Sequence, residues 1–141
     1  MKKLKVLFLS LLALTTIVSC SKDDDNDSST SASIEGKWEF TQEGESLTSL
    51  EPAENEGNCG LDITEYISGG AFKETDYYMN NEECKSYNDS GTWSKNGNTL
   101  TEKYTNDDEP DTYEIIELSQ TTLKLKEIDE EGTWYTVYKR K

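Results

Sequence analysis

The segment at residues 90–105, SGTWSKNGNTLTEKYT, contains two runs of alternating large and polar residues around Asn96-Gly97. Alternation with a period of two is the pattern of a β-strand with one buried face. Asn-Gly between two such runs is the strongest short-range signal for a β-hairpin. The segment therefore predicts an antiparallel hairpin with strands at residues 90–94 and 99–105.

The same pattern continues in both directions along the chain. Turn residues, including Gly69-Gly70 and Ser119-Gln120, separate the alternating runs, and no window shows sustained helical spacing. Further strands are predicted at residues 36–41, 61–67, 71–78, 112–118, 122–128 and 133–140. We therefore expect an all-β domain, an antiparallel meander of about eight strands that packs as a sandwich or closes into a small barrel.

A different pattern precedes this domain. Lys2, Lys3 and Lys5 form a basic segment, and residues 6–18 are apolar except for a serine and two threonines. This layout is typical of a secretory signal and is short for a helix that spans a membrane. We predict a signal peptide at residues 1–19.

The segment Ile17-Val18-Ser19-Cys20 resembles the lipobox of bacterial lipoproteins. The resemblance implies that Cys20 becomes the first residue, carries diacylglycerol on its sulfur and is acylated on its amino group, with palmitate among the expected chains. Several acyl chains make a stable membrane anchor, whereas one does not. The alternative is an ordinary secretory signal in which Cys20 has no special role.

An acidic, serine-rich tether is predicted at residues 20–33. Ser21 follows the cysteine in place of the aspartate that resembles an inner-membrane retention mark, which favours the outer membrane. Residues 21–25, SKDDD, resemble the short acidic signal that exports Bacteroidota-type lipoproteins to the cell surface. A flexible, solvated linker has the same composition, so this reading remains open beside surface export.

Charge and composition exclude several classes of function. Removal of residues 1–19 takes away three of 14 basic residues and none of 29 acidic ones, which leaves a net charge of about −18. Such a charge repels phosphates, so we expect no nucleic-acid partner. The chain contains no histidine, which excludes imidazole catalysis and histidine-bound metals. We predict no enzyme activity, cofactor or metal; the acidic residues 106–111 favour a solvated turn over a Ca²⁺ site.

Two cysteines, Cys59 and Cys84, remain if Cys20 is lipidated. An even pair in an exported chain is most simply a disulfide. Two free thiols or a pair of metal ligands are the alternatives, and neither has supporting residues nearby.

Gly36-Lys37-Trp38 resembles the Gly-x-Trp signature of the lipocalin superfamily. The order of "GKWEF", Cys59, "GGAF", Cys84, "GTWSKNGNTL" and "YTVYKRK" is similar to the bacterial lipocalin-like domain of Bacteroidota lipoproteins. The resemblance covers residues 34–141 and implies an eight-stranded barrel. It also implies that Trp38 packs across the closed end, with Lys139 or Arg140 stacked on it.

The barrel interior is predicted from the alternation. The expected inward set is Leu61, Ile63, Ile67, Phe72, Leu100, Tyr104, Ile115, Leu123, Leu125, Trp134 and Tyr138. By the same alternation Glu65, Glu74 and Glu102 share these faces, and with Tyr104 they are candidate ligand-binding residues near the barrel mouth. The alternative is that the carboxylates lie beyond the core or are turned outward by a bulge.

Two functions remain open for this domain. One is a monomeric binding module that holds a small apolar or amphipathic molecule at the membrane surface. The other is a structural or interaction protein whose barrel is filled by side chains, since a barrel of eight strands is just wide enough for either.

Overall fold

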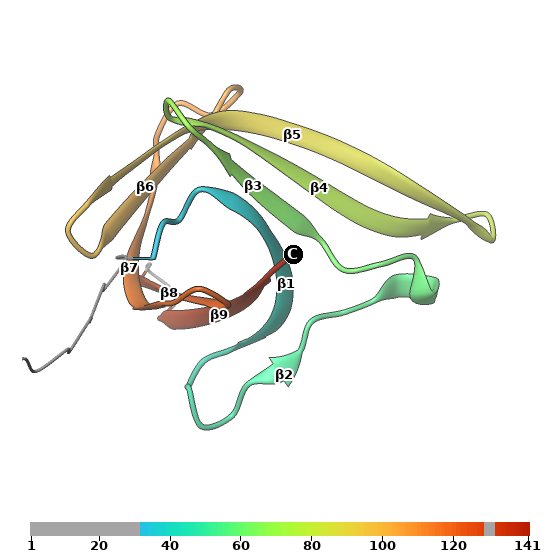
Figure 1. Ribbon diagram of the computed structural model, residues 1–141. Coiled ribbons are helices and arrows are strands. Elements are labelled where there is room, and N and C mark those ends of the chain that lie inside the picture. Colours follow the sequence, from blue (N-terminus) through green and yellow to red (C-terminus); the bar gives the residue numbers. More distant parts are fainter. Residues whose placement is uncertain (1–31, 129–131) are drawn as a thin grey trace, which may run out of the picture.

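The computed structural model describes residues 32–128 and 132–141 (Figure 1). The predicted signal peptide, Cys20, nearly all of the predicted tether and the turn at residues 129–131 lie outside the described residues. Within them the elements are β1 (Gly36–Gly44), β2 (Glu51–Pro52), the 3₁₀ turn η1 (Glu56–Asn58), β3 (Ile63–Ile67), β4 (Ala71–Asn80), β5 (Glu83–Asn96), β6 (Thr99–Tyr104), β7 (Asp111–Leu118), β8 (Thr122–Ile128) and β9 (Thr133–Arg140).

These strands form one closed antiparallel barrel. Neighbours along the chain pair in order from β3 to β9, and β1 pairs with both β3 and β9. The short strand β2 is an addition that pairs only with the end of β1. Each of the eight barrel strands has a partner on both sides, so the described residues complete the barrel by themselves. The predicted fold and the hairpins at Gly69-Gly70 and Gly97 are confirmed.

A stacked tryptophan and arginine close one end of the barrel. The Trp38 side chain is fully buried, and its Nε1 donates to the Ile34 carbonyl at 2.6 Å. Cζ of Arg140 lies 4.1 Å from the centroid of the Trp38 ring. The Arg140 guanidinium also donates to the carbonyls of Glu35, at 2.8 Å, and of Gln120, at 3.0 Å. Arg140, on β9, therefore links three segments at this end of the barrel: β1, the turn between β7 and β8, and the chain just before β1.

Gly36 makes room for this arginine. Its φ is +123°, a conformation that side chains with a Cβ rarely adopt. A Cβ at this position would lie 2.6 Å from Nη1 of Arg140. Both residues of the Gly-x-Trp pair thus contact Arg140. Gly36 leaves space for the guanidinium, and the Trp38 ring stacks on it.

The core lies against this closed end. It consists of Ile34, Trp38, Tyr66, Phe72, Leu100, Ile115, Leu123 and Leu125, with Trp93, Tyr104, Tyr113, Leu118 and Tyr138 packed against it. The sequence predicted most of these residues correctly. The inward phase was wrong for Leu61, Ile63 and Ile67, which do not belong to the core cluster. Trp134 is also outside the cluster, but it shares the inward face of β9 with Thr136 and Tyr138.

In β3 the prediction assigned the wrong set of alternate residues to the inward face. Thr64 and Tyr66 are buried there, whereas the more apolar Ile63 and Ile67 are only half-buried. Tyr66 lies directly opposite Phe72 in the β3–β4 register, and residues opposite each other share a face. Trp134 has the predicted inward phase but is 39% exposed, because it lies near the start of β9 at the end of the barrel away from Trp38.

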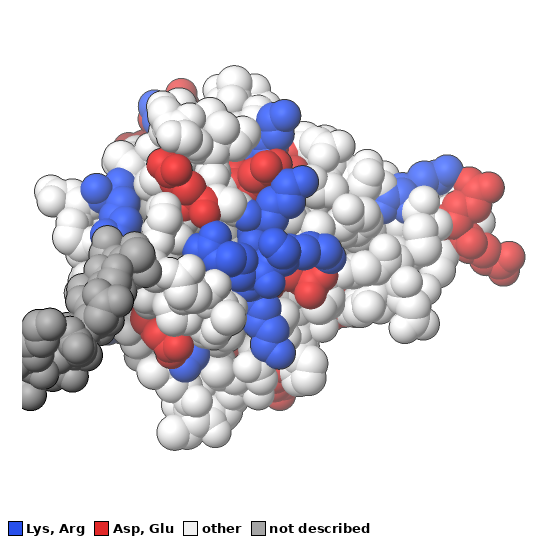
Figure 2. All heavy atoms as spheres, viewed as in Figure 1, with Lys and Arg blue, Asp and Glu red and all other residues white. Residues whose placement is uncertain are grey.

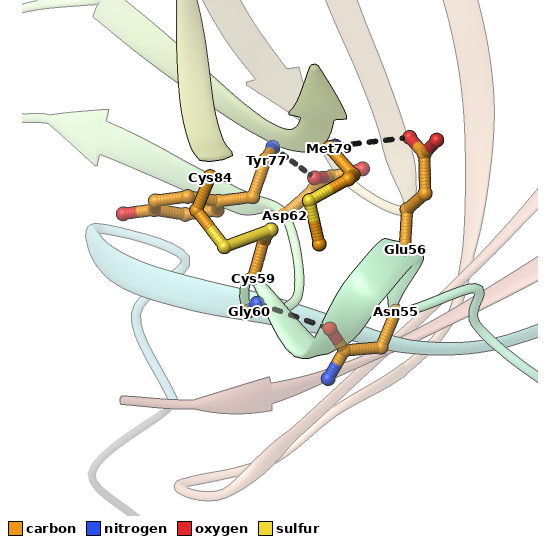
Figure 3. Close-up of a disulfide and its surroundings, with 8 residues drawn as sticks. All are labelled: Asn55, Glu56, Cys59, Gly60, Asp62, Tyr77, Met79 and Cys84. Atoms are coloured by element: carbon orange, nitrogen blue, oxygen red, sulfur yellow. Dashed lines mark hydrogen bonds between the residues drawn. A yellow bond between two sulfur atoms is a disulfide. The ribbon is translucent and has the colours of Figure 1, made fainter. Parts of the chain in front are cut away.

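The β4–β5 hairpin is longer than predicted and extends beyond the neighbouring strands (Figure 1). Figure 3 shows how the chain around η1 is attached to it. Cys59 is bonded to Cys84 near the hairpin tip, with a Cα–Cα distance of 5.2 Å. The Met79 N–H donates to Oε2 of Glu56 at 3.3 Å. The predicted disulfide is therefore present, and it fastens the β2–β3 connection to the projecting hairpin.

We expect Trp38→Ala to destabilise the domain by about 3–5 kcal/mol, because it empties a fully buried site at the point of closure. The measurement is the free energy of unfolding in urea. Trp134→Ala is the matched control, and because Trp134 is partly exposed its cost should be well below that of Trp38→Ala. Equal costs for the two variants would contradict the assigned closed end.

We expect the double variant Cys59→Ser/Cys84→Ser to lower the free energy of unfolding by about 3.5 kcal/mol, the chain-entropy value for a loop with a sequence separation of 25. Peptide mapping without reductant should find the two cysteines cross-linked in the unmodified protein. Alkylation of both thiols without reductant would show that the bond is absent.

Candidate functional site

The inward face of the barrel changes character along its axis. On β6 the order away from the closed end is Leu100, Glu102, Tyr104, and Leu100 is fully buried. On β8 the order is Leu123, Leu125, Glu127. An apolar floor beside Trp38 therefore gives way to polar side chains toward the other end.

Four further strands repeat this change. Each begins near the closed end with an aromatic or aliphatic inward residue and reaches a carboxylate farther along. The series are Trp38, Phe40 and Glu43 on β1; Phe72, Glu74 and Asp76 on β4; Trp93, Gly91 and Asp89 on β5; and Ile115, Tyr113 and Asp111 on β7. Because paired residues share a face, these carboxylates all project toward the interior or its open rim.

Two tyrosine–glutamate pairs cross the interior above the floor. The Tyr66 hydroxyl donates to Oε1 of Glu102. The Tyr104 hydroxyl donates to Oε2 of Glu74 at 2.5 Å. We call these four residues the Tyr–Glu belt. Its members come from β3, β4 and β6, so the belt exists only because the barrel brings these strands around one interior.

Aromatic contacts hold the belt tyrosines in place. The ring of Tyr104 meets that of Phe72 edge-on, with 5.0 Å between centroids. The ring of Tyr66 meets that of Trp93 edge-on at 5.5 Å. Nε1 of Trp93 in turn donates to the Ile67 carbonyl at 3.0 Å. The hydroxyl positions are therefore set by ring packing, which pre-organises the belt.

Burial changes the protonation of the belt glutamates. Glu102 is only 5% exposed, and this burial raises the pKa of its carboxyl to about 7. The hydrogen bond from Tyr66 opposes the rise, and the negative charges of Glu74 and Asp111 add to it. Burial likewise raises the pKa of Glu74, against the hydrogen bond from Tyr104. At neutral pH Glu102 is therefore near the midpoint of its titration.

The tyrosines of the interior remain neutral. Burial, reinforced by Glu102, raises the pKa of the Tyr66 hydroxyl well above its ordinary value. Burial and Glu74 raise the pKa of Tyr104 in the same way. Both hydroxyls thus stay protonated and can donate hydrogen bonds across the physiological range.

An open groove lies at the rim, on the side of β1 and β2. It has a volume of about 580 Å³, and Glu43, Glu45, Glu51, Glu54 and the partly exposed Trp134 contribute to its lining. Nε1 of Trp134 donates to Oε2 of Glu43 at 3.2 Å. The groove therefore offers an aromatic surface beside several carboxylates.

Three of the four candidate ligand-binding residues lie inside the barrel, namely Glu74, Glu102 and Tyr104. The expected inward position of Glu65 was wrong. Glu65 pairs with Lys37 on the outer face, with 3.7 Å between Oε2 and Nζ. The phase of β3 explains this correction, since Glu65 alternates with the buried Thr64 and Tyr66.

Tyr66 is the belt residue that the sequence did not reveal. Its strand presents Ile63 and Ile67 as the more apolar alternate set, so apolarity pointed to the wrong face. The available signal was the tight turn at Gly69-Gly70, which places Tyr66 opposite Phe72. A strongly apolar Phe72 therefore marks the inward face of both strands.

Within residues 32–128 and 132–141, no group of three or more acidic or cysteine side chains is placed to hold a metal ion. Of the acidic residues 106–111, all but Asp111, which begins β7, lie in the connection between β6 and β7, and Nζ of Lys103 donates to the Asp108 carbonyl there at 3.0 Å. None of the helices in the described part is long and apolar enough to cross a membrane.

Solved structures with the same fold come from bacteria and from a tick. An uncharacterised protein from Bacteroides eggerthii superposes with a TM-score of 0.55 at 14% identity, over 77% of this chain and 100% of that chain. A lipocalin-like protein from Bacteroides uniformis gives 0.54 at 16% identity, over 77% and 98%. Japanin from Rhipicephalus appendiculatus, bound to cholesterol, gives 0.50 at 14% identity, over 74% of each chain.

These identities are low, so the structures establish likeness of fold alone. No curated protein matches the sequence. The sequence profile of the lipocalin-like domain matches residues 34–125, which extend from the closed end into β8. The match covers the Gly-x-Trp pair, the belt and most of the floor. The chain therefore belongs to the lipocalin-like domain family.

Proposed function

We propose that this chain is a cell-envelope lipoprotein whose barrel binds a small apolar or amphipathic molecule without catalysing a reaction. The observation that carries the proposal is the change along the interior from an apolar floor to a polar belt. Ligand sites of this kind bury an apolar body and orient it with a few polar groups. The fully buried Trp38, Leu100 and Leu123 form the packed base of the interior. Above it the partly buried rings of Tyr104 and Tyr113 supply apolar surface, and the Tyr–Glu belt supplies the polar groups.

Family membership supports the binding role. The lipocalin fold accommodates an apolar ligand in at least one similar structure, since Japanin was solved with cholesterol. Because the chain has no histidine, the belt glutamates cannot take part in imidazole chemistry. Their hydrogen bonds to neutral tyrosines favour recognition of a polar group.

The membrane location is part of the same proposal. We infer that Cys20 carries the lipid anchor and that residues 20–33 form the tether, so that the barrel is held at the outer membrane, on the cell surface. The described chain enters the barrel at the closed end, where Arg140 contacts Glu35. A tether attached there would leave the carboxylate-lined end of the barrel free.

We expect Cys20→Ser to leave the protein uncleaved or unanchored, because the sulfur to which diacylglycerol is transferred is missing. Detergent partitioning of cell extracts, with mass measurement of the product, tests this. The control is Cys59→Ser/Cys84→Ser, which should be processed and anchored normally. A Cys20→Ser protein that is fully processed and membrane-bound would refute the anchor.

We expect residues 32–141 to bind the neutral apolar fluorophore N-phenyl-1-naphthylamine with a saturable rise in its emission. Thr136→Trp should abolish this binding, because Thr136 lies opposite Leu125 on the inward face and an indole there would fill the interior. Tyr135→Trp, one residue away on the opposite face, is the matched control. Absence of binding in the unmodified domain would favour the barrel filled by its own side chains.

A further inference from the structure

Most lysines of the barrel strands lie on the outer face, whereas carboxylates lie on both faces. Six lysines lie at outward positions, each next in sequence to an inward residue: Lys37, Lys73, Lys103, Lys124, Lys126 and Lys139. Figure 2 shows lysine and arginine atoms gathered on the outer surface around β1 and the carboxyl terminus. A chain with a strong excess of acidic residues thus places much of its positive charge outside the barrel.

Outward-facing glutamates use these lysines as partners. Oε2 of Glu117 lies 2.7 Å from Nζ of Lys124, and Oε2 of Glu114 lies 3.3 Å from Nζ of Lys126. Glu65 is paired with Lys37 in the same way. The negative charge on the outer wall is therefore locally compensated, although each exposed pair contributes little to stability.

The inward Glu74 and Glu102 differ from these outer glutamates in their partners. In the part of the chain that the structure describes, neither forms a salt bridge with a lysine or arginine, and their hydrogen-bond donors are the neutral Tyr104 and Tyr66. Glu102 is only 5% exposed, and its side chain faces the interior. A buried carboxylate without a cation is costly unless it takes up a proton or a positive ligand.

The titratable groups that interact with Glu102 come from six barrel strands, β3, β4 and β6 to β9. They are Glu74, Asp111, Glu127, Tyr66, Tyr104, Tyr113 and Tyr138, and no lysine or arginine is among the causes that shift the pKa of Glu102. None of these groups is a cation. The burial that raises the pKa of Glu102 to about 7 leaves a proton there which a positive ligand group could displace.

The rim of the barrel also carries groups that favour a cation. The groove between β1 and β2 combines Trp134, which is 39% exposed, with the carboxylates of Glu43 and Glu51. An indole face beside carboxylates attracts ammonium groups through the ring quadrupole as well as through charge. A cation would therefore meet a favourable potential both at the rim and at the Tyr–Glu belt.

From this arrangement we propose that the barrel selects a protonated amine with an apolar body, whose ammonium group is bound by Glu74 and Glu102 while its apolar part packs on the partly buried aromatic rings above the floor. This assignment rests on the proposed binding function and specifies in addition that the ligand is positively charged. The ammonium group donates to the two carboxylates, which in the ionised state act purely as acceptors. The proton held by Glu102 passes to the buffer as the cation binds.

Three probes with the same chain test the assignment: octylammonium, octan-1-ol and octanoate, each used to displace N-phenyl-1-naphthylamine from residues 32–141 at neutral pH. We expect octylammonium to bind about tenfold or more tightly than octanol, the range for a hydrogen bond to a charged group, and octanoate to bind most weakly. Calorimetry in two buffers of different ionisation enthalpy should show proton release for octylammonium only.

Glutamate-to-glutamine variants, which keep the side-chain shape and remove the charge, test which residues cause the preference for octylammonium. Glu102→Gln and Glu74→Gln should each bring the affinity for octylammonium toward the affinity for octanol, and the ratio of the two affinities measured on the same variant is the readout. Glu65→Gln on the outer face is the matched control and should retain the full preference.

The outcomes separate the two proposals. Equal affinity for the three probes, or a preference for octanoate, would overturn the cation assignment and leave the binding function standing. A preference that survives both Glu102→Gln and Glu74→Gln would overturn the assigned residues. Failure of every probe, the fluorophore included, would overturn the cation assignment together with the binding function.

Discussion

The stacking of Arg140 on Trp38 is the contact on which the rest of the structure depends. It joins the first and last barrel strands where the sheet closes on itself, and the same guanidinium reaches the carbonyls of Glu35 and Gln120. A sheet of this size without closure would expose two strand edges to water and to other chains. Closure removes the edges and turns one face of every strand toward a single narrow interior.

That narrow interior explains why the placement of charge matters. On an open sheet, Glu74 and Glu102 would face water and could ionise freely. In the barrel they face tyrosines, aromatic rings and one another, and burial raises the pKa of each. The protein thus accepts a local loss of stability at neutral pH, since the folded state holds Glu102 protonated at pH values where the unfolded chain would ionise it. Such a cost at a pre-organised polar group is typical of a binding site.

The disulfide has a separate role from the closed end. It lies at the opposite end of the molecule, where β4 and β5 extend past their neighbours and gain no support from a closed sheet. The Cys59–Cys84 bond and the contact between Glu56 and Met79 hold the β2–β3 connection against this hairpin. The covalent link therefore stabilises the part of the molecule that barrel closure does not reach.

The sequence by itself determined the strands, their hairpins, the Gly-x-Trp closure and the cysteine pair, because each depends on residues close together or on a signature with a local cause. Gly36 and Trp38, for example, are two residues apart and act on one arginine. The presence of Glu74, Glu102 and Tyr104 in the interior also followed from alternation around Phe72 and Leu100, which are too apolar to face water.

Only the tertiary structure decided the phase of β3 and the composition of the Tyr–Glu belt. Alternation with a period of two divides a strand into two faces but does not say which face is inside, and in β3 the more apolar set is the outer one. The register with β4 turns Tyr66 inward and Glu65 outward. Tyr66 then meets Glu102, 36 residues away in sequence, because closure wraps β3 and β6 around the same interior.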